Sequence, residues 1–316
     1  IDDISITAPG FTNICHDIAL LSSLGIRLII TFGTRTQIEE ALQKQGIMSN
    51  FCNGLRITDA ASMPVIEQVV GQMRIRFESV LSMGLPVTST AEGRLRVVSG
   101  NTVVSRPIGI HNGVDFLYTG AVRRIDTPLI ASLLDQHAVV LLPPIGVCST
   151  GELFNLSSAE VAKAAAVAVK ADKLIFLSHE GRLETDSGEL ITEMTAEQGL
   201  GMLEAPELAG HLMTILTVAI RACQKGVSRV HLLDSAIDGA LLAELFTLDG
   251  TGTLITRDNY ESIRPATLDD IPGILDIIRP LEMAGTLIGR DQQHLELEIE
   301  KYYLIERDGT VIGCAG

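Results

Sequence analysis

The turn at Gly33–Thr36 combines residue types and spacing that suit the binding of an anion such as a carboxylate. It follows the apolar run Ile26–Phe32 and precedes a helix-like segment, Gln37–Lys44. Backbone N–H groups and the positive end of the helix dipole at such a turn attract negative charge. Arg35 lies inside the turn and adds a positive charge. The sequence therefore predicts a ligand-binding role for Gly33 and Arg35.

Arg56 is a second candidate for binding a carboxylate. It lies in the segment Gly54–Asp59. A guanidinium group binds a carboxylate through two parallel hydrogen bonds, which gives orientation as well as affinity. An ordinary surface arginine is an equally good interpretation of Arg56.

Glu244 is the most unusual carboxylate in the chain because it lies within an apolar helical segment, Ala240–Phe246. It follows His231 by thirteen residues and precedes Gly250 by six. A carboxylate beside an apolar face needs a partner if it is buried. A cationic ligand would supply one, and a structural salt bridge would do so equally well. A lone histidine such as His231 is more often structural than functional.

Familiar catalytic signatures do not occur. The sequence contains no Walker A motif, GxGxxG, HExxH or GxSxG. Five widely spaced cysteines, without a CxxC pair, fit neither a disulfide framework nor a zinc site. We interpret them as core thiols in a reducing compartment and expect no metal site.

The composition argues against several classes of partner. The 316 residues include 24 Lys and Arg against 39 Asp and Glu, a formal net charge of −15. An acidic chain without a basic block is a poor partner for nucleic acid or anionic membranes. No apolar run reaches the roughly 18 residues that a membrane-spanning helix needs. The first residues, Ile1–Phe11, do not resemble a secretory signal.

Apolar runs that alternate with helical segments predict an α/β fold. Ile26–Phe32 is almost fully apolar, as a strand buried on both faces should be. Four similar runs are Leu95–Ser99, Ala138–Leu142, Lys173–Leu177 and Arg229–Leu233. Helices are predicted over Ile14–Leu24, where Gly25 ends the helix, and over Ala159–Lys170. Ser157 and Glu160 fit a capping box at the start of the second.

A change of pattern near Thr256–Ser262 predicts two domains, over residues 1–258 and 263–316. Ser262–Ala266 is predicted to be a short strand, and Thr267 to cap a helix that Pro280 should end or kink. His294–Lys301 is a second amphipathic stretch. Tyr302–Glu306 and Thr310–Ala315 are predicted to form a hairpin.

Twelve short segments, in order along nearly the whole chain, resemble one family. They are Asp17–Leu21, Leu24–Arg27, Gly33–Gln37, Leu55–Asp59, Leu81–Gly84, Val98–Asn101, Gly113–Asp115, Thr119–Asp126, Thr150–Asn155, Ala171–Phe176, His231–Thr253 and Ile277–Glu282. Each is weak alone, but their joint order is specific. The chain resembles the N-acetylglutamate synthases of the bacterial and plant type.

The resemblance implies an amino-acid-kinase-like domain, with an open, mainly parallel sheet sandwiched by helices, followed by the first half of a GNAT acetyltransferase fold. It implies synthesis of N-acetyl-L-glutamate from acetyl-CoA and L-glutamate, the first step of arginine biosynthesis. L-Arginine is typically an inhibitor in this family. Family members assemble as homo-oligomers through the kinase-like domain. They work in the bacterial cytoplasm, or in the plastid stroma in plants and algae. They use acetyl-CoA as a co-substrate and have no permanently bound cofactor.

The first domain departs from kinase chemistry. Kinases of this fold open with a strand that carries a lysine and a Gly-Gly turn, and the corresponding region here is absent or reads Ile1–Ser5. A catalytic aspartate follows the residue matching Asn155 by four positions in those kinases. That position is Ala159, which cannot orient phosphates. We therefore expect a regulatory domain rather than an active acetylglutamate kinase.

The resemblance also implies two ligand sites. His231, Glu244 and Gly250, with Lys173 nearby, match the residues that bind arginine in arginine-sensitive members. Arg290, with Ile288 beside it, matches the arginine that holds the glutamate carboxylate. The family's CoA loop and most catalytic positions would lie beyond Gly316. If the chain ends there, we expect no acetyltransferase activity, and a non-catalytic arginine-sensing module is the alternative function.

Overall fold

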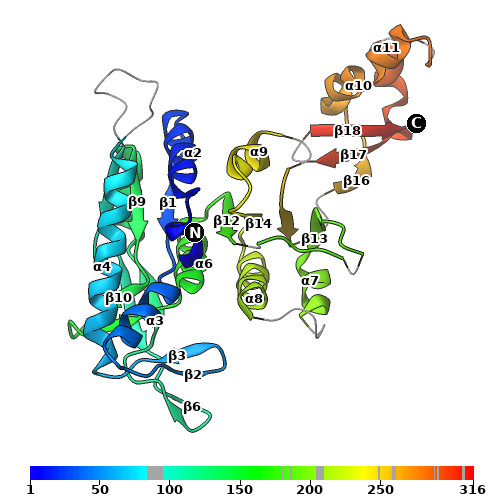
Figure 1. Cartoon of the computed structure of the whole chain (residues 1–316). Coiled ribbons are helices and arrows are strands. Elements are labelled where there is room, and N and C mark those ends of the chain that lie inside the picture. Colours follow the sequence, from blue (N-terminus) through cyan, green and yellow to red (C-terminus); the bar gives the residue numbers. More distant parts are fainter. Residues whose placement is uncertain are drawn as a thin grey trace. The chain divides into compact units, whose positions relative to one another are not determined.

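The chain forms two compact units, Ile1–Arg257 and Asp258–Gly316 (Figure 1). The computed structural model describes residues 1–83, 95–179, 181–185, 187–203, 210–247, 250–257, 261–287, 289, 292–307 and 310–316. Each unit has its own sheet structure and its own buried apolar side chains.

The first sheet of the first unit is parallel. Its strands, in spatial order, are β1 (Ile29–Thr31), β9 (Ala138–Leu142) and β4 (Arg96–Ser99). All residues of β9 are buried. Val139 and Leu141 lie in one apolar cluster, and the residue that follows each of them lies in a second cluster. Because successive side chains of a strand point to opposite faces, a central strand with two cores needs a continuous apolar run.

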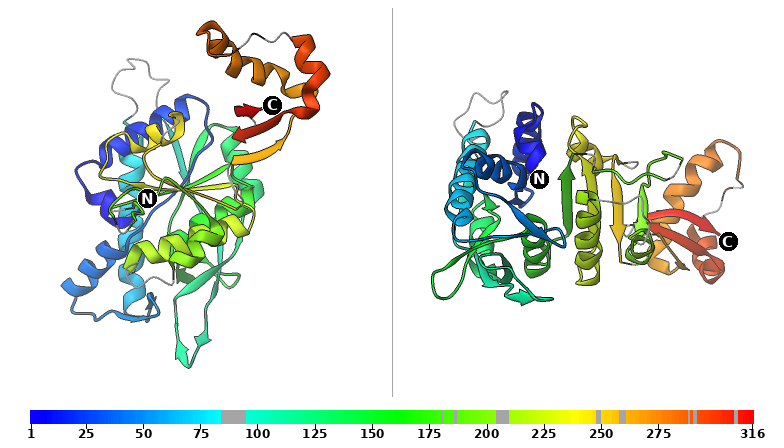
Figure 2. Two further views of the ribbon diagram at one scale, coloured as in Figure 1. Left: turned by 90° about the vertical axis from the view of Figure 1, so that its right-hand side faces the viewer. Right: turned by 60° about the horizontal axis from the view of Figure 1, so that its bottom comes forward.

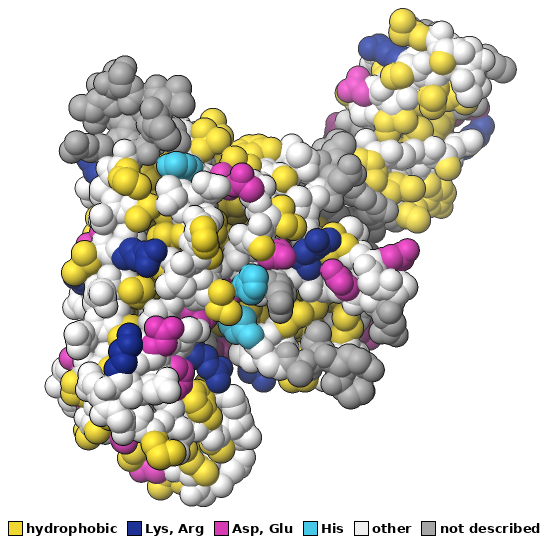
Figure 3. All heavy atoms as spheres, in the orientation of Figure 1, with side chains coloured by type: hydrophobic (Ala, Val, Ile, Leu, Met, Phe, Trp, Pro, Cys, Tyr) yellow, Lys and Arg dark blue, Asp and Glu magenta, His cyan; other side chains and the backbone are white. Residues whose placement is uncertain are grey.

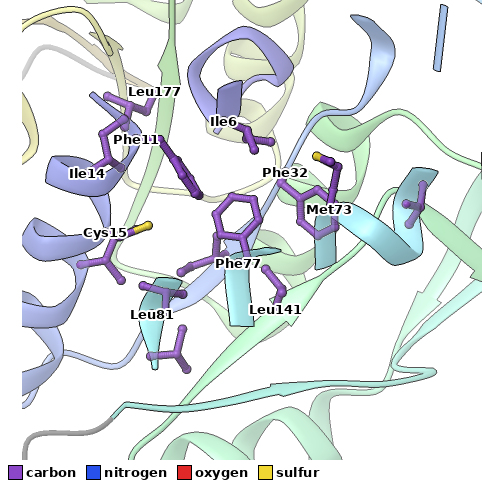
Figure 4. Close-up of a cluster of buried hydrophobic side chains, with 14 of the residues drawn as sticks. Ile6, Phe11, Ile14, Cys15, Phe32, Met73, Phe77, Leu81, Leu141 and Leu177 are labelled. Carbon is purple, nitrogen blue, oxygen red and sulfur yellow. The ribbon is translucent and has the colours of Figure 1, made fainter. Parts of the chain in front are cut away.

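Two helices build the first of these cores. Helix α2 (Phe11–Ser23) packs against α4 (Ser62–Leu81) beside the first sheet (Figure 1). Phe77 of α4 contacts Phe11 edge to face, with ring centroids 4.9 Å apart, and lies 5.1 Å from the ring of Phe32. Figure 4 shows these rings within a cluster of aliphatic side chains. The aromatic cluster holds α2 and α4 to the end of β1.

A second sheet of the first unit contains both parallel and antiparallel strand pairs. Its strands are β11 (Leu153–Asn155), β10 (Ile145–Val147), β5 (Val103–Pro107) and β8 (Gly120–Ile125). Helices α5 (Thr127–Asp135) and α6 (Ser158–Val169) contribute to its core. Helix α3 (Arg35–Lys44) follows β1, and the hairpin β2 (Asn50–Cys52) and β3 (Leu55–Ile57) comes next in the chain. The hairpin β6 (Ile110–His111) and β7 (Val114–Asp115) extends away from the body of the unit (Figure 2).

A third sheet positions the residues that resemble an effector site. Its strands are β12 (Lys173–Ser178), β14 (Arg229–Asp234), β15 (Thr253–Thr256) and β13 (Glu193–Thr195). Its helices are α7 (Ala196–Met202), α8 (Gly210–Gln224) and α9 (Ala240–Phe246). Val230 and Leu232 of β14 are buried with α8. The alternation of the strand therefore turns His231 to the opposite face, where α9 contacts β14.

The second unit is a three-stranded antiparallel sheet with helices between its first two strands. The strands are β16 (Glu261–Pro265), β17 (Tyr303–Arg307) and β18 (Thr310–Ala315). Between β16 and β17 lie η2 (Leu268–Asp270), α10 (Ile271–Met283), α11 (Gln292–Glu298) and η3 (Ile299–Lys301). The Arg264 guanidinium bonds both carboxylate oxygens of Asp270 at 2.7 Å and also pairs with Glu306. This network ties the first turn after β16 to β17.

The predicted elements occur with shifted ends. All five strands predicted for the first unit are present, although β1 covers only three residues of the run Ile26–Phe32. Helix α6 begins after Ser157, whose Oγ accepts a hydrogen bond from Glu160 N at 3.4 Å. This is half of the predicted capping box, and the Glu160 carboxylate pairs with Lys163. Helix α10 continues to Met283, so Pro280 does not end it. The predicted turn of the β17–β18 hairpin includes residues 308 and 309, which lie outside the described residues.

Candidate functional site

His231 and Glu244 form a buried pair between β14 and α9. His231 Nδ1 lies 2.6 Å from Glu244 Oε1, and each side chain is 6% exposed. The other carboxylate oxygen, Oε2, accepts hydrogen bonds from Thr251 N at 2.7 Å and Gly252 N at 3.0 Å. One carboxylate thus joins a strand, a helix and the turn before β15.

These contacts favour the ionised form of Glu244. Burial alone would raise the pKa of this carboxyl group. The hydrogen bonds from His231, Thr251 and Gly252 oppose burial and outweigh it, so that the pKa lies below its ordinary value. The site therefore presents a negative charge in an enclosed position, which suits a cationic ligand such as a guanidinium.

Gly250 is required by the close approach of the turn to Glu244. Its φ is +60°, and a Cβ atom at this position would lie 2.6 Å from Glu244 Oε2. A side chain here would push the carboxylate out of its contacts. The glycine permits both the left-handed backbone and the contact.

Lys173 and the second ring nitrogen of His231, Nε2, complete the predicted cluster. Lys173 begins β12 and is paired in register with Arg229 of β14. Burial and the nearby Arg229 lower the pKa of Lys173, while the charges of Asp172 and Glu244 act in the opposite direction. His231 Nε2 is buried without a hydrogen-bond partner in the described part of the chain. The structure thus brings together His231, Glu244 and Gly250, with Lys173 in electrostatic reach of Glu244.

The predicted anion-binding turn is occupied by the chain itself. Thr36 N and Thr36 Oγ1 both donate to Asp3 Oδ2, each at 2.6 Å. A Cβ atom on Gly33 would lie 2.9 Å from Asp3 N. Asp3 belongs to a short helix, α1 (Asp3–Thr7). The backbone N–H of Thr36 lies in the predicted turn, but the Thr36 hydroxyl was not a predicted donor, and the acceptor is intramolecular. The ligand-binding role of Gly33 and Arg35 stays a prediction.

The buried Arg56 forms an ion pair within the protein. It is 7% exposed, lies 2.6 Å from Glu39 of α3, and donates to Ser49 Oγ at 2.6 Å. Burial lowers the pKa of Arg56, and the neighbouring Glu39 opposes that change. The guanidinium carbons of Arg35 and Arg56 lie 4.7 and 4.9 Å from the centre of the Phe51 ring. Arg35 and Arg56 therefore meet at the β2–β3 hairpin.

Asn155 is held in a separate network of hydroxyl groups. Its Nδ2 donates to Thr58 Oγ1 at 3.1 Å, and Thr119 Oγ1 donates to the Arg56 carbonyl at 2.6 Å. These bonds tie the end of β11 to the segment that follows β3. Ala159, in the first turn of α6, offers no carboxylate beside them.

The remaining predictions concern the second unit, metals and membranes. Ile288 and Arg290 lie outside the described residues. Within the described ranges, no three His, Cys, Asp or Glu side chains are grouped to hold a metal ion. None of the helices described is both long and apolar enough to cross a membrane. Figure 3 shows basic side chains dispersed among acidic and apolar ones on the visible face of the first unit.

Sequence reasoning missed three contributors to these sites. They are the backbone N–H groups of Thr251 and Gly252, and the carboxylate of Asp3. The Gly-Thr-Gly turn seven residues after Glu244 was a usable signal for the first two. Asp3 is 33 residues from Thr36, and only the tertiary fold brings it there.

Comparisons with known proteins identify the family of the chain. Residues 4–234 match the amino acid kinase family. An amino-acid acetyltransferase from Aeromonas salmonicida is 48% identical over 98% of this chain, which spans 71% of that relative. An amino-acid acetyltransferase from Azotobacter vinelandii is 45% identical, with 97% of this chain and 71% of the relative covered.

Solved structures give the same result. N-acetylglutamate synthase from Neisseria gonorrhoeae, complexed with coenzyme A and L-arginine, matches with a TM-score of 0.91 and 35% identity, covering 100% of this chain and 73% of that one. Giardia carbamate kinase has the same fold at 15% identity, with a TM-score of 0.56 over 78% of this chain and 90% of that one. With 45–48% identity to the curated relatives over almost its whole length, the chain belongs to the amino-acid acetyltransferase family, and its first unit has the amino acid kinase fold.

Proposed function

We propose that the protein is an N-acetylglutamate synthase that transfers the acetyl group of acetyl-CoA to the amine of L-glutamate. The observation that supports this most strongly is the match of the whole chain to the Neisseria gonorrhoeae enzyme, which has been solved with coenzyme A and with coenzyme A and N-acetyl-glutamate. The carbon–nitrogen bond forms as the thioester carbon–sulfur bond breaks. The amine loses a proton to a base or to water, and CoA leaves as the thiolate.

We place arginine as the effector at His231, Glu244, Gly250 and Lys173. The Glu244 carboxylate is ionised and enclosed, and a guanidinium is a permanent cation with five N–H donors. A carbonyl group of the turn at Gly250 is a suitable acceptor for donors that Glu244 leaves unpaired. The ammonium of Lys173 would pair with the carboxylate of the amino acid. The Neisseria gonorrhoeae enzyme, solved with L-arginine, supports this choice of ligand.

The second unit is, in this proposal, the first part of a GNAT acetyltransferase domain. Its β-α-α-β-β order agrees with that assignment. Arg290 would hold the carboxylate of glutamate, with the backbone of Ile288 beside it. We further propose a homo-oligomer and a cytoplasmic location, the latter because all five cysteines are free.

The test is an assay of the protein at its natural length with acetyl-CoA and L-glutamate. Release of the CoA thiol and formation of N-acetyl-L-glutamate, identified by mass, are the expected result. D-Glutamate and L-aspartate are the substrate controls. No product above the rate without enzyme would overturn the proposed reaction, and an unchanged rate with L-arginine would overturn the effector assignment alone.

A further inference from the structure

His231 leaves one of its two ring nitrogens without a partner. Nδ1 lies 2.6 Å from Glu244 Oε1, whereas Nε2 is buried and has no hydrogen-bond partner among the described residues. The whole side chain is only 6% exposed. Buried polar atoms are usually paired, because an unpaired one costs free energy. Nε2 is therefore a position that a ligand group of matching polarity would complete.

The contact with Glu244 fixes which ring nitrogen carries the proton. Burial raises the pKa of Glu244, but the hydrogen bonds that its carboxylate accepts outweigh burial and keep the group ionised. An ionised carboxylate only accepts hydrogen bonds, so Nδ1 of His231 must be the donor. In a neutral imidazole the other nitrogen then has a free lone pair. Nε2 is therefore an acceptor while the ring is neutral, and it becomes a donor only when the ring gains a second proton.

Charged groups of both signs share the face of the third sheet on which the His231 ring lies. Side chains alternate between the two faces of a strand, and partners in register share a face. In the described part of this sheet and of α9, the charged side chains on that face are Glu244 of α9, Lys173 of β12, Arg229 of β14 and Glu193 of β13. The register partners of His231 itself, Ile175 and Leu254, are apolar. Glu244 thus favours a charged ring, whereas the two cations disfavour one.

We propose that His231 Nε2, in the neutral ring with its proton on Nδ1, accepts a hydrogen bond from the guanidinium of arginine, so that the effector and a proton compete for one nitrogen. This inference rests on the proposed effector site and makes that site respond to pH as well as to arginine. A proton on Nε2 removes the acceptor and places a second cation beside the guanidinium. Arginine binding therefore releases this proton wherever the free ring is charged, and the affinity for arginine falls as the pH falls.

Calorimetric titration of the protein with L-arginine, between about pH 8 and about pH 5.5, tests the competition. At each pH the titration is run in two buffers of different ionisation enthalpy, which counts the protons released. We expect the Kd to rise by up to about tenfold for each pH unit below the titration of the imidazole, with up to about one proton released per arginine bound. Glu244 stays ionised over this range because its pKa lies below its ordinary value, so its own titration does not produce the change.

His231→Asn separates the ring from the other titrating groups of the protein. An asparagine amide can still donate to Glu244, but it does not titrate and has no acceptor at the position of Nε2. We expect the variant to bind arginine about 3–30-fold more weakly than the parent protein at pH 8, with an affinity that is flat in pH. His211→Asn, on the exposed surface of α8, is the matched control and should keep the pH profile of the parent. Equal pH profiles of His231→Asn and the parent would overturn the inference.

The sign of the pH dependence separates this inference from the effector assignment. An affinity that rises as the pH falls would show that Nε2 donates to the carboxylate of arginine, and it would reject the competition while leaving the effector site in place. An affinity independent of pH would do the same. No binding at pH 8 by the folded parent protein would overturn the effector site, and this inference with it. If His231→Asn does not fold, NMR of the imidazole nitrogens in the parent decides the question. A proton on Nδ1 alone, with a change at Nε2 when arginine is added, is expected, and a proton on Nε2 at pH 8 would reject the inference.

Discussion

Glu244 makes most of the hydrogen bonds of the proposed effector site. Three donors from two elements, strand β14 and the turn before β15, converge on its two oxygens. Because the folded-state pKa lies below the ordinary value, this group stabilises the fold while it is ionised. The contribution is fully present above the unfolded pKa, near 4.5, and is lost as the pH falls through the lower folded value.

Glu244→Gln should flatten the acid side of the stability profile. At pH 7 we expect the variant to lose about 1–3 kcal/mol of unfolding free energy, because charge-assisted hydrogen bonds become neutral ones. The difference from the parent should shrink as the pH falls from 5 toward 3. Urea unfolding at several pH values measures this, with Glu40→Gln on the exposed surface of α3 as control. A difference that stays constant with pH would contradict the assigned pKa direction.

Gly250→Ala tests the close approach of the turn. Its φ of +60° and the 2.6 Å contact with Glu244 Oε2 predict a loss of about 1–3 kcal/mol. Gly71→Ala, inside helix α4 with no atom near the new methyl group, is the matched control and should be neutral or slightly stabilising. Denaturation midpoints of the two variants decide the point. Equal stability of both would show that the turn is free to relax.

At the scale of elements, the β2–β3 hairpin is held by the guanidinium group of Arg56, a residue that the sequence analysis treats as a candidate for ligand binding. Arg56 is enclosed by Glu39, Ser49 and Phe51. Glu39 is 17 residues away, so the pairing is a product of tertiary structure rather than of local spacing. The sequence left Arg56 between ligand binding and an ordinary surface arginine. Arg56 is buried and paired with Glu39, so the surface interpretation is wrong, and the ligand-binding role stays a prediction.

Arg56→Lys should loosen this hairpin, because a lysine keeps the charge but loses the planar fork and the stacking on Phe51. We expect a loss of about 1–3 kcal/mol in unfolding free energy. Arg74→Lys in α4, where the ion pair to Glu78 is half-exposed at 3.4 Å, should cost less than about 0.5 kcal/mol. Equal effects of the two substitutions in urea titrations would argue against a structural role for Arg56.

Strands β1, β4, β9, β12 and β14 of the first unit were predictable from the sequence because each lies in a short, mainly apolar run, whereas the strands of the second sheet were not predicted. Strand β9, with cores on both faces, is the clearest example. The start of α6 was predictable from Ser157, because a cap is a local interaction. Helix α1 was not predictable, because it has only five residues and depends on contacts with Thr36, His179 and Ser235.

The candidate effector site was predictable only through the family resemblance. Spacing alone did not decide whether Glu244 contacts a ligand or forms a structural salt bridge. The structure shows a hydrogen-bonded His231–Glu244 pair, which is compatible with both interpretations. The similarity to an N-acetylglutamate synthase solved in complex with L-arginine is what favours a ligand. For Ile288 and Arg290, which lie outside the described residues, the predicted role stays a prediction.

At the scale of the whole molecule, a kinase fold serves a protein of the acetyltransferase family. In the resemblance to the kinases, Ala159 matches the position of a catalytic aspartate, and an alanine cannot orient phosphates. We therefore expect no ADP formation from ATP, with or without N-acetyl-L-glutamate. A coupled assay of the purified protein measures this, with an active acetylglutamate kinase as the positive control. ADP release above the background rate would contradict a regulatory role for the first unit.

The central claim is that the first unit senses arginine through Glu244, and calorimetric titration of L-arginine tests it most directly. The parent protein should bind L-arginine but not L-lysine. Glu244→Gln, shown to be folded by circular dichroism, should bind about 10–100-fold more weakly, because a charge-assisted hydrogen bond contributes about 1.5–3 kcal/mol. Equal affinity of the parent protein and Glu244→Gln for arginine, or no binding by a folded parent protein, would contradict the account.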